Sequence, residues 1–361
     1  MTMQRLENLS MNLKKMIQNK HYMKESVQEF CHRIGQDELL VQGAGGNISW
    51  KNENELWVKA SGKWIADAKR EEIFVTVDLK DLQEQINNKN FDPSPKLLSG
   101  SDLRPSIETM MHALMPQKVV LHLHAIEPLA LLVKRDCEAE LKERMTEYKF
   151  DWLIIDYVKP GKLLAAEIYS GLLRKPNADI IFLKNHGIVL AANSVEDLEK
   201  KLEIINNLFK SNNESKSSYD SIQIKNNSRN IKGYKLVKDE SIQSLVWDEK
   251  LFSCLQNFWI LYPDHVVFLG PKPFLYESLE ELKDLELNEE TPELIFVKDN
   301  GVYAKESFNH TKSLQLRCYY QVLIRQKNRS EIRSLTNLEI QDLLGWDAEK
   351  YRIDLAERKT V

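Results

Sequence analysis

Apolar and polar positions alternate with two different periods along this chain. Over residues 1 to about 36, apolar residues recur at helical spacing among many Lys, Gln and Glu residues, which predicts helix. From Leu39 onward, short apolar and β-branched runs are separated by Gly, Asn and Lys turns, which predicts a group of strands. The predicted strands cover residues 39–42, 48–50, 56–60 and 73–77.

A polar loop over 84–103 leads into a predicted helix that begins at Pro105 and ends at Pro116. Proline is tolerated in the first turn because its missing N–H is not needed there. Glu108 then lies on the flank of this helix, beside its apolar face. That face is formed by Ile107, Met110, Met111 and Leu114.

Two later apolar runs, 119–124 and 180–183, predict strands, and the second is apolar enough to be buried. Ser194, followed three residues later by Asp197, predicts the capped start of an amphipathic helix. Strands that alternate with helices in this way predict an α/β fold.

The stretch 211–232 is rich in Asn and Ser and poor in apolar residues, so it is the best candidate for a domain boundary. We therefore expect a first domain over 1–212, a linker over 213–232 and a smaller C-terminal α/β domain over 233–361.

The C-terminal part contains a weak echo of the first. Residues 294–303 resemble 180–189, both predicting a strand, a glycine turn and a second strand before a helix, and 263–268 resemble 116–121. Convergence on similar turns explains this as well as a duplication does, so both interpretations stay open. In a duplication, Asn300 stands where His186 stands, and the C-terminal unit is a degenerate half-repeat with a structural or substrate-shaping role and no second metal site.

The composition narrows the class of protein. With 361 residues, of which 42% are hydrophobic and 29% charged, the chain is long enough for two packed domains. A net charge of −4 argues against nucleic acid or an anionic membrane as the main partner. The scattered cysteines, the lack of a signal-peptide core and the lack of a membrane-length apolar run predict a soluble, cytoplasmic protein.

The glycine-rich stretch VQGAGGNISW, residues 41–50, has the composition of a ligand-binding loop. A dinucleotide fingerprint needs a third glycine where this chain has Ile48, and a helix where this chain has β-formers. That interpretation fails, but free amides with an Asn and a Ser suit a bound anion.

Histidines supply the clearest candidate chemistry. His122 and His124 point to one face of a strand, about 6.6 Å apart at Cα, so both imidazoles can reach one ion. Leu121 and Leu123 then point to a core. His186 follows the second buried strand, and three imidazoles with an open fourth position are the pattern of catalytic zinc. The alternative is that these histidines are structural.

Glu108 and His112 are four residues apart on the predicted helix. Glu108 is either a further ligand or base, or a solvated carboxylate in the first helical turn. The spacing also fits a metal pair, but we favour an ordinary hydrogen bond between the two side chains.

Taken together, these motifs resemble the class II aldolase/adducin family, whose members include fuculose-phosphate and rhamnulose-phosphate aldolases. The resemblance covers about residues 20 to 210, and it is closest to the aldolase part of bifunctional rhamnulose-phosphate aldolase/short-chain dehydrogenases. The matching motifs are Gly45-Gly46-Asn47-Ile48-Ser49, Val58-Lys59-Ala60-Ser61-Gly62, Arg104-Pro105-Ser106-Ile107-Glu108, His122-Leu123-His124, Lys159-Pro160-Gly161 and Asn185-His186-Gly187.

The resemblance implies a three-layer α/β/α domain and a site with assigned roles. His122, His124 and His186 correspond to the ligands of Zn²⁺ or another divalent metal, and Glu108 to the catalytic acid/base. The positions that correspond to the phosphate-binding residues are Gly46, Asn47, Ser61, Gly62 and Ser106.

The implied function is that of a lyase, an aldolase that cleaves or forms a C–C bond in a sugar or sugar phosphate through a metal-stabilised enediolate. The alternatives are a dehydratase, epimerase or decarboxylase at the same metal site, a lyase acting on a nucleotide-linked or non-phosphorylated sugar, and a non-catalytic adducin-like interaction module. The resemblance also implies a homo-oligomer such as a tetramer.

Two details depart from the family pattern or stay open. Phosphate-binding members carry two hydroxyl residues ahead of the glutamate, whereas this chain has Ser106 and Ile107, which weakens the expectation of a phosphorylated substrate. Tyr148, Tyr157 and Tyr351 are candidates for the family's proton-donating tyrosine by their location only.

Overall fold

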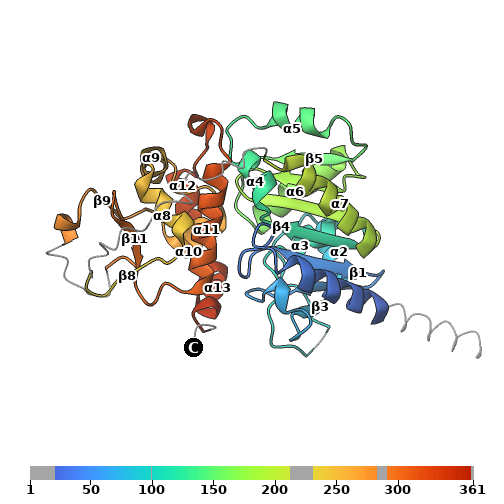
Figure 1. The fold of residues 1–361 in the computed structure, drawn as a ribbon. Coiled ribbons are helices and arrows are strands. Elements are labelled where there is room, and N and C mark those ends of the chain that lie inside the picture. Colours follow the sequence, from blue (N-terminus) through green and yellow to red (C-terminus); the bar gives the residue numbers. More distant parts are fainter. Residues whose placement is uncertain (1–20, 99, 212–230, 283–290, 359–361) are drawn as a thin grey trace, which may run out of the picture.

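Two β-sheets organise the residues that the computed structural model describes, which are 21–98, 100–211, 231–282 and 291–358. Figure 1 shows the seven-stranded sheet with its helices beside the unit that holds the four-stranded sheet. No helix among these residues is both long and apolar enough to cross a membrane.

The larger sheet has the strand order β3-β2-β1-β4-β7-β6-β5, and all neighbours are antiparallel except β5 and β6. β6 and β7 are buried along their whole length, as expected of central strands covered on both faces. The strands are β1 (Asn47–Lys51), β2 (Glu55–Lys59), β3 (Phe74–Asp78), β4 (Val119–Leu123), β5 (Trp152–Ile155), β6 (Ile180–Leu183) and β7 (Gly187–Ala192).

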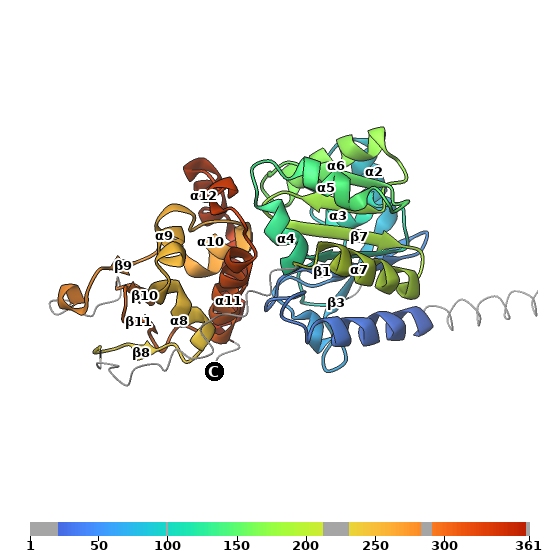
Figure 2. The ribbon, with the colours of Figure 1, turned by 45° about the horizontal axis from the view of Figure 1, so that its top comes forward.

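Helices cover both faces of this sheet and so give the expected three layers. Helix 21–34 and α7 pack with Leu121 and Leu123 in one core, whereas α3 and α6 pack with Val120 in another. Figure 2 shows helix 21–34 and α7 on one side of the sheet and α2 and α6 on the other. The helices of this unit are α2 (Leu79–Asn87), α3 (Thr109–Leu114), α4 (Ile126–Leu132), α5 (Glu138–Met145), α6 (Lys162–Arg174) and α7 (Val195–Phe209), with the 3-10 turn η1 (Ile65–Asp67).

Most of the predicted elements of this unit are confirmed. Three of the four early strands form as β1, β2 and β3, and Ser194 caps α7 by accepting a bond from the Asp197 backbone N–H. Residues 39–42 form turns instead of a strand. The predicted N-terminal helix is present over 21–34, and the rest of that prediction lies outside the described residues.

The helix predicted to begin at Pro105 begins at Thr109 instead. Pro105 is held extended because it pairs with Ala60 in an isolated antiparallel bridge. The Thr109 backbone N–H then donates to the Ser106 carbonyl at 3.0 Å and starts the turn. As a result Glu108 is not on a helix flank but at the N-cap position of α3.

The C-terminal unit holds the sheet β8-β11-β10-β9 and a helical cluster. Its strands are β8 (Lys235–Leu236), β9 (Leu275–Tyr276), β10 (Leu294–Val297) and β11 (Gly301–Ala304). Its helices are α8 (Glu240–Trp247), α9 (Glu249–Asn257), α10 (Pro263–Leu269), α11 (His310–Ile324), α12 (Asn337–Leu344) and α13 (Asp347–Arg358), with the 3-10 turns η2 (Leu279–Leu282) and η3 (Arg329–Glu331).

The internal echo is confirmed in one place and wrong in the other. β10, its turn, β11 and α11 repeat the order of β6, its turn, β7 and α7, and both turns have a left-handed residue, Asn185 with φ 53° and Asp299 with φ 51°. Residues 263–268, by contrast, form helix α10 and not a strand, because Pro263 suits the first position of a helix.

The two units share one apolar core. Ile126, Leu129 and Val133, from α4 and the residue that follows it, join the apolar cluster of the C-terminal unit. At the edge of this contact Arg325 of the C-terminal unit lies 2.8 Å from the carboxylate of Glu127. The predicted linker, 213–232, falls almost entirely on residues outside the described ranges, so the domain division stays a prediction.

The buried His265 makes the stability of this shared core depend on pH. Its ring is fully buried among Trp259, Tyr262 and Tyr319, and both ring nitrogens lack a hydrogen-bond partner among the described residues. Burial disfavours the charged imidazolium and lowers the pKa of His265 to about 3. The unfolded state, with a pKa of about 6.5, therefore binds a proton that the folded state does not bind in the window between these values.

We expect the free energy of unfolding to fall as the pH falls below about 6.5, and His265→Phe to remove about 1.4 kcal/mol per pH unit of that slope. Urea unfolding at several values between about pH 4 and pH 7 measures it. The exposed His21 offers the control, since His21→Ala should keep the wild-type slope. An unchanged slope in His265→Phe would show that His265 does not contribute.

Candidate metal centre

Three buried histidines meet at one end of the larger sheet. His122 lies in β4, His124 directly follows that strand, and His186 lies in the turn between β6 and β7. One ring nitrogen from each lies within 4.8 Å of the others, and the Nε2 atoms of His122 and His124 are 3.2 Å apart. The structure thus brings together the three histidines that the sequence singles out.

Burial keeps the imidazoles of His122 and His186 neutral. It lowers the pKa of His122 and lowers the pKa of His186 to about 3, so both rings carry a free lone pair at neutral pH. His122 Nδ1 lies 3.0 Å from the carbonyl oxygen of Ile188, which orients its Nε2 toward the other rings. A neutral imidazole with one nitrogen oriented by the backbone is the form in which histidine binds metals.

Glu108 faces this cluster from the start of α3 and is only 6% exposed. Its Oε2 lies 3.5 Å from His122 Nε2 and its Oε1 lies 3.6 Å from His186 Nε2. Burial alone would raise its pKa, but the imidazoles of His122 and His186 and the amide of Asn47 outweigh burial and lower the pKa to about 2. Glu108 is therefore ionised at neutral pH.

The predicted side-chain bond between Glu108 and His112 does not form, and the i, i+4 bond between these residues joins the His112 backbone N–H to the Glu108 carbonyl at 3.3 Å. His112 is fully buried, and its ring nitrogens instead contact Asn47 Oδ1 and, at 2.7 Å, Ser49 Oγ. Asn47 in turn donates from Nδ2 to Glu108 Oε2 at 2.8 Å. His112 therefore acts on Glu108 through Asn47, and it is not in the histidine cluster.

Two polar atoms at this centre have no hydrogen-bond partner among the described residues, Glu108 Oε1 and His186 Nδ1. A buried carboxylate oxygen without a partner costs free energy, and a cation held by neutral imidazoles would remove that cost. Nitrogen and oxygen donors of this kind suit Zn²⁺ and other divalent metals. The residues present therefore fit a metal ion.

The residues expected to bind phosphate line the same small pocket as Glu108, His124 and His186. They are Gly46, Asn47, Ser61, Gly62 and Ser106. Gly46 has φ 67°, and a Cβ at this position would lie 2.7 Å from the His122 carbonyl oxygen, so only glycine fits. Part of this set already has partners within the chain. The Ser61 backbone N–H donates to the Arg104 carbonyl, and Leu355 of α13 covers Gly62.

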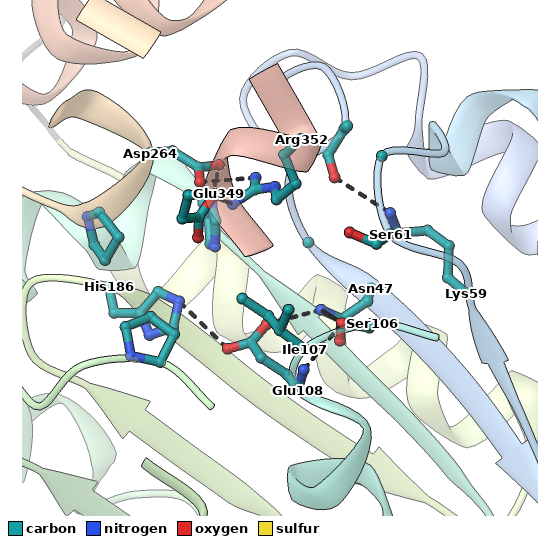
Figure 3. A pocket seen from close by; sticks show the side chains of 16 residues that line it. Asn47, Lys59, Ser61, Ser106, Ile107, Glu108, His186, Asp264, Glu349 and Arg352 are labelled. Atoms are coloured by element: carbon teal, nitrogen blue, oxygen red, sulfur yellow. Dashed lines mark hydrogen bonds and ion pairs between the residues drawn. The ribbon is translucent and has the colours of Figure 1, made fainter. Parts of the chain in front are cut away.

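Charged residues that the sequence did not single out complete the pocket, and Figure 3 shows them opposite Glu108 and the histidine rings. Arg352 lies between two carboxylates, 2.8 Å from Asp264 and 2.9 Å from Glu349. Lys59 is 2% exposed, donates to the Lys63 carbonyl at 2.6 Å, and has its pKa lowered to about 7 by burial. The one signal in the sequence for Asp264 is a charge within an otherwise apolar segment.

None of the three candidate tyrosines is among the described residues that line the pocket. Tyr148 is exposed and stacks on Phe150. The rings of Tyr157 and Tyr351 lie under the guanidinium groups of Arg333 and Arg104, at 5.6 and 4.3 Å. The proton-donating tyrosine therefore stays unassigned.

Comparison with known proteins finds a family whose model matches about the first half of this chain. The model "Class II Aldolase and Adducin N-terminal domain" matches residues 25–212. The chain is 28% identical over 196 residues to "Uncharacterized oxidoreductase YuxG" of Bacillus subtilis, a match that covers 49% of this chain but only 28% of that protein. It is 26% identical over 196 residues to "L-fuculose phosphate aldolase" of Methanococcus vannielii, covering 53% of this chain and 94% of that protein.

Among solved structures, the N-terminal class II aldolase domain of a conserved protein from Thermoplasma acidophilum is similar with a TM-score of 0.43 and 23% identity. The match covers 51% of this chain and 90% of that chain. "L-fuculose 1-phosphate aldolase" is similar with a TM-score of 0.39 and 16% identity, covering 52% and 82%.

Residues beyond the family match hold the His186 turn in place. The fully buried Asn185 donates from Nδ2 to the carbonyl oxygens of Leu261, at 2.9 Å, and Arg333, at 2.8 Å. The Arg333 guanidinium donates back to Asn185 Oδ1 at 3.2 Å. The left-handed turn that carries His186 is therefore fastened to the C-terminal unit.

We expect Asn185→Ala to lower the free energy of unfolding by about 2–4 kcal/mol, because it removes the donor to the buried Leu261 carbonyl and the part-buried Arg333 carbonyl and places alanine at a positive φ. Equilibrium unfolding in urea gives the value. Asn257→Ala, which removes an exposed bond to Ser253, should stay within about 0.5 kcal/mol of wild type. Equal losses in the two variants would contradict the role of Asn185.

Proposed function

This chain belongs to the class II aldolase and adducin family, and on that premise we propose that it is a divalent-metal-dependent lyase that cleaves or forms a C–C bond in a sugar or sugar phosphate. The observation that carries the proposal is the convergence of three buried imidazoles with an ionised carboxylate at a polar pocket. A scaffold protein has no need to bury such a set, because each buried polar group costs free energy.

His122, His124 and His186 would hold the metal ion in this proposal. When bound, the ion would supply Lewis acidity that polarises a substrate carbonyl and stabilises negative charge beside it. Zn²⁺ fits three imidazole ligands with an open fourth position, so we propose Zn²⁺ as the native metal.

Glu108 would move the proton. It is ionised at neutral pH, and its Oε1 has no hydrogen-bond partner among the described residues, so that oxygen is the natural acceptor of a substrate proton. Asn47 holds the other oxygen at 2.8 Å and thereby fixes the direction in which Oε1 points. The line from His112 through Asn47 to Glu108 would keep this geometry during turnover.

Gly46, Asn47, Ser61, Gly62 and Ser106 would bind the end of the substrate away from the reacting carbon, and so convert binding energy into orientation. Ile107 lines the same pocket where phosphate-binding members have a hydroxyl residue. The proposal therefore includes both phosphorylated and non-phosphorylated sugars as substrates. In keeping with the family, we also propose a homo-oligomer.

The first test is the metal content of the purified wild type, by elemental analysis without added metal. We expect about one divalent ion per chain, and its loss in His124→Ala, because the variant lacks one of the three imidazoles that would hold the ion. His21→Ala, which changes an exposed histidine, should keep the metal. A wild type that binds no metal even after incubation with Zn²⁺ would favour an adducin-like interaction module.

The second test separates metal binding from proton transfer. Glu108→Gln should keep the metal and lose about 10²- to 10⁴-fold in kcat for C–C cleavage, since the amide cannot accept the proton. The assay uses a panel of short ketoses, with and without phosphate, and follows release of the aldehyde. If Glu108→Gln cleaved its best substrate at the wild-type rate, the proton would have to move through another group.

A further inference from the structure

The C-terminal unit reaches the histidine cluster through one carboxylate. Asp264 lies in α10 and is 1% exposed, and its Oδ2 lies 3.2 Å from His124 Nδ1. We propose that Asp264 is a positioning residue for the metal centre, which orients His124 from outside the aldolase-like part of the chain. This inference rests on the proposed function, because it assigns a role relative to the metal.

The two ring nitrogens of His124 face different partners and therefore have different roles. Nε2 faces the Nε2 of His122 at 3.2 Å, so this nitrogen is the one that points to the shared centre. Nδ1 faces Asp264 on the other side of the ring. A ligand that binds through Nε2 must carry its proton on Nδ1, and a carboxylate there fixes that tautomer and increases the basicity of Nε2.

Asp264 is itself held for this contact. Arg352 donates to its other oxygen, Oδ1, at 2.8 Å, and the second branch of the same guanidinium bonds Glu349 at 2.9 Å. Oδ2 has no hydrogen-bond partner of good geometry among the described residues, and the polar atom that approaches it is His124 Nδ1, at 3.2 Å. One oxygen thus fixes the carboxylate in place and the other is left for the imidazole.

The glycine-rich loop leaves room for the pair. A Cβ at Gly45 would lie 3.2 Å from Asp264 Oδ2 and 3.3 Å from His124 Nδ1. A side chain at this position would press on both partners, so the glycine permits the carboxylate to approach the ring.

The three histidines differ in what orients them. His122 is oriented by the backbone carbonyl of Ile188, which belongs to the same sheet. His186 Nδ1 has no partner among the described residues. The ring of His124 faces a side chain beyond residue 212, where the family match ends, and the turn of His186 is held by residues beyond 212 through Asn185. The C-terminal unit is therefore part of this metal centre and not an appended domain.

Asp264→Ala and Asp264→Asn in the full chain test the proposal. We expect the dissociation constant for Zn²⁺, measured by competition with a chelator, to rise about 10- to 100-fold in Asp264→Ala. The rise should be smaller in Asp264→Asn, because the amide oxygen still accepts from Nδ1. With Co²⁺ as the probe, the visible absorption bands should shift in both variants, since the ligand field at His124 changes.

Two controls separate positioning from general loosening. Asp239→Asn removes another carboxylate of the C-terminal unit, which caps α8 and pairs with Arg317 at 2.9 Å, and it should leave both readouts unchanged. In a His124→Ala background, whose weakened affinity is measured by direct titration with excess Zn²⁺, Asp264→Asn should cause no further loss of affinity, because the residue through which it acts is gone.

Unchanged affinity and unchanged Co²⁺ bands in the Asp264 variants would overturn the inference. So would an equal loss in Asp239→Asn, or a loss that persists in the His124→Ala background. If circular dichroism shows that neither variant folds, Asp264→Glu keeps the charge for Arg352 but displaces the carboxylate by one methylene, and unshifted Co²⁺ bands would then overturn it. A wild type that binds no metal contradicts the proposed function instead.

Discussion

The antiparallel pairing of β4 with β7 is the constraint on which the rest of the centre depends. Its register sets His122 opposite Val189 and Leu123 opposite Ile188, so the end of β4 meets the turn that carries His186. A slip of one residue would turn His122 into the apolar core below helix 21–34 and α7. The pairing of β1 with β4 places Asn47 directly opposite His122, which brings the amide that holds Glu108 to the same point.

This pairing gathers polar groups in a place where water is excluded, and the surrounding chain satisfies most of them. Asn47, Ser49 and His112 bond one another in the interior, and Lys59 is capped by backbone carbonyls. Among the buried polar atoms of the described residues that stay without a hydrogen-bond partner are two at the centre itself, Glu108 Oε1 and His186 Nδ1. A ligand that bonds such unpaired buried groups gains binding free energy, because it removes the cost of burying them without a partner.

The pattern of neighbouring residues correctly predicted the features that depend on short-range interactions along the chain. Alternation of apolar residues located β1, β2 and β3, and the spacing of His122 and His124 placed both rings on one side of their strand, with Leu121 and Leu123 in the core. The third histidine was placed by its position after a buried strand together with the family resemblance, and the structure brings it to the other two.

Three of the failures share one cause, which is contact between residues that are far apart in the sequence. Pro105 has good chemistry for a helix start, but its bridge to Ala60 keeps it extended. The side-chain bond expected between Glu108 and His112 gave way to Asn47, which arrives from β1. Asp264 could not be connected to His124, 140 positions earlier, by any periodicity, because their contact depends on how two units pack.

The smaller sheet repeats the strand arrangement of one part of the larger sheet, but it contributes to the pocket in a different way. The order β8-β11-β10-β9, antiparallel except for β9 and β10, repeats the order and directions of β4-β7-β6-β5. The turn that carries His186 in the first sheet carries Asn300 in the second, where Asn300 Oδ1 accepts a bond from the Tyr303 hydroxyl at 2.5 Å. The equivalent turn is thus used for structure and offers no imidazole. The C-terminal unit contributes instead through helices α10 and α13, which line the pocket. Lining a pocket requires only that side chains of these helices face away from their own unit.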